Sequence, residues 1–383
     1  MSYEIEIGRA KRGRRAFSLD DIAIVPSRRT RDPEDVSTKW QIDAFTFDTP
    51  VIGAPMDSVM SPATAIALGQ LGGLGVLNLE GLWTRYEDVQ PVLDEIANLE
   101  VDLADAAAET KVTRKLQELY SAPIQPELIT ARLKEIRDSG VVVAGSLTPQ
   151  RTQEHYKTVL AAGVDIFVIR GTTVSAEHVS QTQEPLNLKQ FIYELDVPVI
   201  VGGASGYTPA LHLMRTGAAG VLVGFGGGAT STTRRALGIN VPTATAISDV
   251  AAARRDYLDE SGGRYVHVIA DGGLGTSGDI VKALALGADA VMLGTALARA
   301  DEAPGQGWHW GMEASHESSP RGDRVRVGRV GPLNELMFGP SHHSNGTSNL
   351  MGMLRRSMAT TGYSELKEFQ RVDVLVNDSI GGR

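Results

Sequence analysis

Short apolar runs alternate with segments of helical periodicity along most of this 383-residue chain. Continuous apolar runs of four to six residues are typical of strands buried on both faces, as in a parallel sheet. Eight such runs separated by helical segments predict a (β/α)8 TIM barrel. The runs are residues 50–54, 75–78, 141–145, 165–170, 198–203, 220–224, 266–271 and 290–294.

Glycines separate several predicted helices from the strands that follow them. Gly163, Gly217 and Gly287 each stand after a helical segment and before an apolar run. Glycine at this position accepts the left-handed backbone conformation that ends a helix. The repetition of this pattern supports the alternating architecture. The clearest helical segments are residues 150–161, 208–216, 249–260 and 278–286.

A length of 383 residues suits one large barrel or two ordinary domains, and the regular alternation favours a single domain over residues 1–383. Residues 80–140 interrupt the rhythm with helical periodicity at 89–99, 114–120 and 126–136. We interpret them as a helical elaboration of one strand-to-helix connection. Residues 303–383 form a loop-rich C-terminal part with a helix-like piece at 347–361.

Composition excludes several kinds of function. The formal net charge is −9, which disfavours nonspecific binding to nucleic acid or to an anionic membrane. The absence of cysteine excludes disulfides, thiolate metal ligands and thiol nucleophiles. No apolar run reaches the roughly 18 residues of a membrane span, and the N-terminus lacks the apolar region of a signal peptide. We therefore expect a soluble cytoplasmic protein.

Glycine-rich segments follow the sixth, seventh and eighth predicted strands, at residues 224–234, 270–279 and 294–295. In a TIM barrel these loops lie on the catalytic face, where the loops after strands 7 and 8 commonly bind phosphate. Asp271, at a strand end, suits the hydroxyls of a ribose. Taken singly, the first loop could be a structural turn and Asp271 a loop cap. Together the three loops predict a nucleotide site.

Several motifs resemble those of the inosine-monophosphate (IMP) dehydrogenase and GMP reductase family. They are residues 17–26, 49–59, 270–279, 292–295 and 311–313. The likeness covers most of the chain. The segment between residues 78 and 141 is too short for the pair of regulatory CBS modules that many IMP dehydrogenases carry. The chain is therefore most similar to the shorter, CBS-less branch of the family.

The resemblance implies a purine nucleoside 5′-monophosphate as ligand, a role in purine metabolism and GMP biosynthesis, and a homo-tetramer or octamer. Asp271 would contact the ribose, Gly273, Gly294 and Thr295 the phosphate, and Met56 and Met312 the base. The implied substrate-binding set is completed by Gly226, Gly228 and Gly272. The family also uses NAD, and it binds a monovalent cation such as K⁺ through loop carbonyls, here those of Gly226, Gly228 and Ser231.

The chain departs from the family at the residues of hydride chemistry. Ser231 stands at the position of the catalytic cysteine, whereas Thr233 matches a threonine that helps to activate water. Arg170 replaces an aspartate that contacts the nicotinamide nucleotide, and Glu313 and Ala229 replace a glycine and a phosphate-binding serine. The mobile flap with its Arg-Tyr pair is not recognisable between residues 312 and 330, so the segment from 303 reads as a flap remnant.

Three readings of function follow. The first is a purine monophosphate-binding protein whose cysteine-dependent, NAD-linked chemistry is lost or altered, acting as a sensor or as a regulatory partner of an active IMP dehydrogenase. The second is an active NAD(P)-dependent oxidoreductase in which Ser231 and Thr233 are catalytic. In the third, Arg170 recruits a second anion and the barrel does different chemistry. Residues 308–310 (Trp-His-Trp) have two readings, stacking on a base or packing against the barrel rim. We interpret His342 and His343 as residues of a solvated loop rather than as a metal site.

Overall fold

The computed structural model describes residues 4–99, 106–171, 174–181, 184–224 and 226–377. Eight parallel strands form a closed barrel in which β6 to β13 pair in sequence order and β13 returns to β6. This confirms the predicted (β/α)8 TIM barrel. The strands are β6 (Val51–Gly53), β7 (Leu74–Asn78), β8 (Ala144–Leu147), β9 (Ile166–Arg170), β10 (Val199–Ala204), β11 (Gly220–Val223), β12 (His267–Asp271) and β13 (Ala290–Leu293).

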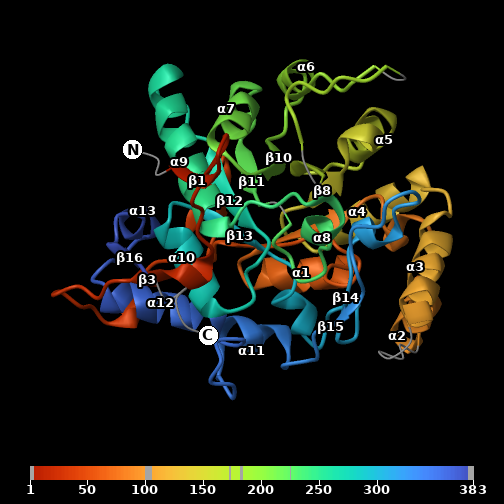
Figure 1. Ribbon diagram of the computed structural model, residues 1–383. Helices are drawn as coiled ribbons and strands as arrows, with labels where there is room; N and C mark the ends of the chain where they lie inside the picture. Colours follow the sequence, from red (N-terminus) through yellow and green to blue (C-terminus); the bar gives the residue numbers. More distant parts are fainter. Residues whose placement is uncertain (1–3, 100–105, 172–173, 182–183, 225, 378–383) are drawn as a thin grey trace.

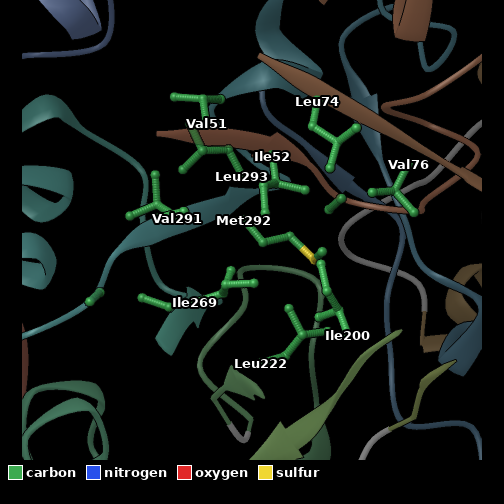
Figure 2. Close-up of a cluster of buried hydrophobic side chains, with 14 of the residues drawn as sticks. Val51, Ile52, Leu74, Val76, Ile200, Leu222, Ile269, Val291, Met292 and Leu293 are labelled. Atoms are coloured by element: carbon green, nitrogen blue, oxygen red, sulfur yellow. The ribbon is translucent and has the colours of Figure 1, made fainter. Parts of the chain in front are cut away.

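The barrel strands are buried on both faces, which explains why their sequences are continuously apolar. Figure 2 shows side chains from β6, β7, β10, β11, β12 and β13 packed together. Ile200, Leu222 and Ile269 are fully inaccessible to solvent. The barrel is therefore a packed core, and a ligand site has room only at the strand ends and the loops that follow them.

Helices surround the barrel (Figure 1). Gly163, Gly217 and Gly287 all have positive φ, as predicted for residues that end helices. The helices between the strands are α1 (Pro62–Gln70), α4 (Pro126–Asp138), α5 (Pro149–Ala161), α6 (Leu188–Tyr193), α7 (Tyr207–Arg215), α8 (Thr233–Leu237), α9 (Thr243–Glu260) and α10 (Ser277–Ala285).

Several element boundaries differ from the predicted ones, among them those of β8 and α9. The third barrel strand begins at Ala144 and runs to Leu147, whereas the apolar run began at residue 141. Ser146 belongs to the strand although it is polar, because this end of β8 faces the rim. Helix α9 begins at Thr243, six positions before the predicted start, because the alanines and threonines of its first turns give little apolar contrast.

The elaboration over residues 80–140 is helical where it is described. Helices α2 (Gln90–Asn98), α3 (Ala106–Tyr120) and α4 correspond to its three predicted helical stretches. Figure 1 shows α2 and α3 at the right edge of the molecule. They share an apolar cluster of their own, which includes Ile96, Leu116 and Trp310. The elaboration is thus joined to the segment after β13, and α3 packs on the short η5 (Met312–Ser315).

The segment after β13 completes the ring of helices. Helix α12 (Leu350–Thr360) packs against α10 and α11 (Leu333–Phe338), and its Leu350, Met351 and Leu354 are fully buried. The remaining elements are α13 (Leu366–Phe369) and paired short strands. These strands are β1 (Glu4–Gly8) with β2 (Lys11–Arg14), β4 (Trp40–Ile42) with β5 (Phe45–Phe47), β14 (Trp308–His309) with β15 (Val325–Arg326), and β3 (Ile22–Ile24) with β16 (Val374–Val376).

Within the described residues, no helix combines the length and apolar character that crossing a membrane requires.

Candidate functional site

A cavity opens at the carboxyl ends of the barrel strands, where the loops after β11, β12 and β13 meet. The structure brings nearly all the predicted site residues to its wall. Those that line it are Met56, Arg170, Gly226, Gly228, Ser231, Thr233, Asp271, Gly272, Gly273, Gly294 and Thr295. Met312 lies apart from this set and lines an adjoining cavity.

The loops after β11 and β12 approach so closely that glycine is required. A Cβ on Gly224 would lie 1.7 Å from the carbonyl oxygen of Asp271, which leaves no space for any side chain. Gly272 and Gly273 have positive φ, and a Cβ on Gly273 would lie 3.2 Å from the carbonyl oxygen of Gly227. Glycine leaves the main chain of both loops at the cavity wall without a covering side chain, which is what an anion site built from backbone N–H groups needs.

A capping box closes the N-terminus of α10, which follows the loop after β12. Thr276 accepts from the N–H of Asp279, and the Asp279 carboxylate in turn accepts from the N–H groups of Gly275 and Thr276. The N–H of Ser277 donates to the carbonyl of Gly346. Two donors of the first helical turn are thus already bonded within the protein, which leaves the glycine loops as the main backbone donors for an anion.

Arg170 and Asp271 form an ion pair inside the cavity. The Nε group of Arg170 donates to Oδ2 of Asp271 at 3.1 Å, and the side chains are 22% and 14% exposed. Burial opposes the charged form of Arg170, but the carboxylates of Asp271 and Glu313 outweigh it and raise the pKa of Arg170. The carboxylate expected to contact ribose thus already carries a cationic partner.

Ser231 and Thr233 bond to each other rather than to a base. The Ser231 hydroxyl donates to Oγ1 of Thr233 at 3.1 Å and accepts from the Thr233 N–H at 3.3 Å. Among the described residues, the hydrogen bonds of the Ser231 side chain include neither a histidine nor a carboxylate. A serine hydroxyl becomes a strong nucleophile only when a base takes its proton. The local geometry supplies none.

Residues near position 321 close the cavity from the far side. The carbonyl of Arg321 accepts from the N–H of Thr232, and the N–H of Asp323 donates to the carbonyl of Thr230. Arg321 lines both this cavity and the adjoining one, and its Nε is buried without a hydrogen-bond partner. Sequence reasoning missed Arg321 because the flap motif is not recognisable around it.

Glu313 and His309 also line the cavity. The sequence identifies Glu313 only as a replacement for glycine, whereas in the structure its carboxylate helps to raise the pKa of Arg170. For residues 308–310 the sequence leaves stacking and packing open and does not single out His309. Strand alternation could have separated it from its neighbours, because successive side chains of β14 point to opposite faces.

A buried polar network lies behind the cavity and connects it to the elaboration. The hydroxyl of Tyr120, at the end of α3, donates to Oδ2 of Asp57 at 2.6 Å and accepts from Nε1 of Trp310 at 3.0 Å. Asp57 stands next to Met56, which lines the cavity. Burial raises the pKa of Asp57 to about 6, while the hydrogen bond from Tyr120 works against this rise.

Replacing Tyr120 with phenylalanine is expected to destabilise the protein by about 2 kcal/mol at pH 8, because a buried carboxylate loses its donor. The hydrogen bond favours the ionised form of Asp57, so the cost should shrink at pH 5, where a carboxyl with a pKa of about 6 is protonated. Chemical denaturation at both pH values measures the effect. Tyr193→Phe is the matched control, since Tyr193 is 89% exposed. An equal loss at both pH values would contradict the assignment.

The fold and the site define a class: a TIM-barrel protein whose cavity lies among glycine-rich loops at the carboxyl ends of its strands. Residues 16–317 match the IMP dehydrogenase / GMP reductase domain. The chain belongs to this family.

Individual relatives span nearly the whole chain. An uncharacterized oxidoreductase of Mycobacterium tuberculosis (strain ATCC 25618 / H37Rv) is 53% identical over 375 residues, which cover 97% of this chain and 99% of the relative. The inosine-5′-monophosphate dehydrogenase of Methanocaldococcus jannaschii is 26% identical, with 93% and 91% covered. The crystal structure of an IMP dehydrogenase/GMP reductase-like protein from Corynebacterium glutamicum superposes with a TM-score of 0.91 at 49% identity, covering 98% of each chain.

Proposed function

We propose that the protein binds a purine nucleoside 5′-monophosphate of the IMP type in the cavity at the carboxyl ends of the barrel strands. The observation that carries the proposal is the convergence of three glycine-rich loops and a strand-end carboxylate on one cavity. Family membership and the inosine-5′-monophosphate dehydrogenase among its relatives support the choice of ligand.

In this proposal different groups of the chain bind the phosphate, the ribose and the base of the ligand. The loops at Gly272–Gly273, Gly294–Thr295 and Gly226–Gly228 offer backbone N–H groups to the phosphate. Asp271 accepts from the ribose hydroxyls while it keeps Arg170 as its cationic partner. Met56 offers an apolar surface to the base, with Met312 beyond it in the adjoining cavity.

We also propose that the family's cysteine-dependent hydride chemistry is lost or altered here. Ser231 stands in place of the thiol, and its hydroxyl is engaged by Thr233. Arg170 lines both cavities at the position where the family has an aspartate, but its charge is balanced by Asp271 at 3.1 Å. The proposal uses no step that involves NAD.

A K⁺ ion held by the loop carbonyls of Gly226, Gly228 and Ser231 is a further proposal. Of these three carbonyls, that of Gly228 accepts from the N–H of Ser231 at 3.0 Å. A carbonyl oxygen has two lone pairs, so this bond leaves room for a second partner.

A second candidate function is an active NAD(P)-dependent oxidoreductase. It is favoured by the description of the 53% identical mycobacterial relative as an oxidoreductase and by the position of Thr233 at the cavity.

Two biological settings are further proposals: a cytoplasmic homo-tetramer or octamer, and a regulatory partner of an active IMP dehydrogenase. A third reading assigns Arg170 to a second anion, and the unpartnered Nε of Arg321 in the same region favours it.

Isothermal titration calorimetry with IMP, XMP, GMP and ATP tests the binding proposal. A purine 5′-monophosphate is expected to bind at micromolar concentration, with ATP and the phosphate-free nucleoside inosine binding at least about tenfold more weakly, since the loops recognise a single terminal phosphate. Failure of all three monophosphates to bind would contradict the proposal.

Incubation with IMP and NAD⁺, or with GMP and NADPH, distinguishes the two candidate functions. If hydride chemistry is lost, the absorbance of the reduced cofactor should change no faster with the wild type than with Thr233→Ala. Ser231→Ala should bind IMP as the wild type does, because its hydroxyl serves the loop and not the ligand. Turnover that disappears in Ser231→Ala or Thr233→Ala would establish the oxidoreductase instead.

A further inference from the structure

His309 presents one ring nitrogen to the cavity at the loop after β13. Its side chain is buried, and its Nε2 lies 3.3 Å from the point where a Cβ on Gly294 would stand. Sδ of Met56 is equally close to that point. The loop after the eighth strand is where TIM barrels commonly bind phosphate. The imidazole therefore lies directly beside Gly294, a residue of the predicted phosphate site.

The hydrogen bonds of Ser58 determine which nitrogen of His309 carries the proton. The Ser58 hydroxyl donates its one hydrogen to the carbonyl of Trp310 at 2.9 Å, since a carbonyl can only accept. The same oxygen accepts from the Trp310 N–H at 3.2 Å and lies 2.9 Å from Nδ1 of His309. Nδ1 must then donate to Ser58. The neutral ring consequently has its bare nitrogen, Nε2, directed at the cavity.

The surroundings keep the free ring neutral. Burial, helped by the positive charge of Arg299 on η4 (Leu297–Arg299), lowers the pKa of His309 to about 4. On the cavity side the titratable groups are Arg170, Asp271, Glu313 and Arg321. Tyr120 and Asp57 lie behind Trp310. The guanidinium groups of Arg324, which precedes β15, and of Arg326, on β15, cover the ring of Trp308.

A bare imidazole nitrogen and a phosphate dianion are both acceptors, so they cannot bond without a proton between them. We propose that His309 is the proton-binding contact of the phosphate site, so that a nucleoside 5′-monophosphate dianion binds with uptake of one proton shared between Nε2 and a phosphate oxygen. The inference rests on the proposed function and extends it to a specific residue and a specific protonation state. The proton comes from solvent and returns to it on release.

The linkage has a definite sign. Binding raises the affinity of the site for a proton, so ligand affinity must fall as pH rises. Free phosphate monoesters are dianions above their second pKa of about 6. Between pH 7 and 9 the dissociation constant of IMP is therefore expected to rise by up to about tenfold per pH unit. Inosine, which has no phosphate, should show no such dependence.

Calorimetry with IMP at pH 7.5, in two buffers of different ionisation enthalpy, counts the protons directly. The wild type is expected to take up about one proton per IMP bound, and inosine none. His309→Gln should bind IMP with uptake near zero and a flat pH profile. His342→Gln is the matched control, because His342 lies exposed on a loop and should leave uptake unchanged. If His309→Gln merely disturbed the structure of the site, IMP would bind more weakly but would still take up one proton.

The possible outcomes distinguish failure of the proposed role of His309 from failure of the proposed nucleotide site. IMP binding without proton uptake in the wild type, or with equal uptake in His309→Gln, overturns the role of His309 and leaves the nucleotide site intact. Proton uptake with inosine also overturns it, because the proton would not belong to the phosphate. If no purine monophosphate binds, both proposals fall. The comparison of IMP with inosine uses only the wild type, so the proposal can be overturned even if His309→Gln does not fold: equal proton uptake with both ligands, or none with IMP, contradicts it.

Discussion

Replacing Asp271 with alanine is expected to weaken IMP binding by at least about a hundredfold. A carboxylate that accepts from two ribose hydroxyls contributes charge-assisted hydrogen bonds of about 1.5–3 kcal/mol each, and the loss of such bonds corresponds to that factor. The same change leaves Arg170 without its partner, since the pair is joined at 3.1 Å in a largely buried position. We therefore also expect a loss of stability of about 2 kcal/mol.

A double-mutant cycle separates these two effects of Asp271. The variant Arg170→Ala/Asp271→Ala removes both charges, so it should recover most of the lost stability without recovering IMP binding. Asp301→Ala is the matched control, because Asp301 is exposed on the segment after β13. Thermal unfolding and calorimetry on the four proteins give both readouts. Wild-type affinity in Asp271→Ala would remove the carboxylate from the proposed site.

The variant Gly224→Ala is expected to lose about 3 kcal/mol of stability together with nucleotide binding. Its Cβ would meet the carbonyl oxygen of Asp271 at 1.7 Å, and neither main chain can retreat without disturbing the parallel pairing of β11 with β12. Because Asp271 ends β12, any shift that relieves the clash also moves the carboxylate. The site and the fold are therefore damaged by one methyl group.

Gly228→Ala provides the contrast within the same loop. A Cβ at Gly228 would meet no heavy atom within 4 Å, and its φ is not in the left-handed region. Stability should stay within about 0.5 kcal/mol of the wild type. Denaturant titration of the two variants compares them. Equal stabilities would mean that the close approach at Gly224 relaxes more cheaply than its geometry indicates.

The fold could be predicted from local patterns because each barrel strand is marked by an apolar run of a few residues. Burial on both faces demands a continuous apolar run, and glycine after a helix demands only a local change of backbone. The boundaries of β8 and α9 were less accurate, since Ser146 and the alanine-rich start of α9 lack contrast. The positions of the glycine-rich loops followed from the barrel itself, because all eight strands end at one face.

The partners of the site residues could not be predicted in this way. Arg170 and Asp271 are 101 positions apart, and they meet only because β9 and β12 end on the same rim. The sequence shows that Arg170 has the opposite charge to the family's aspartate. It does not show that Arg170 forms an ion pair with Asp271. The contact between His309 and Ser58 could not be predicted for the same reason, since the two residues are 251 positions apart.

The sequence by itself determined the barrel, the glycine-rich loops and the residue types that face the cavity, because these depend on local periodicity and backbone freedom. Only the tertiary structure decided which groups they meet: the Arg170–Asp271 pair, the hydrogen bond between Ser231 and Thr233, and the contact between Ser58 and Nδ1 of His309. A side chain's charge, partner and proton depend on neighbours within a few ångströms, and in a closed barrel those neighbours come from strands and loops far apart along the chain.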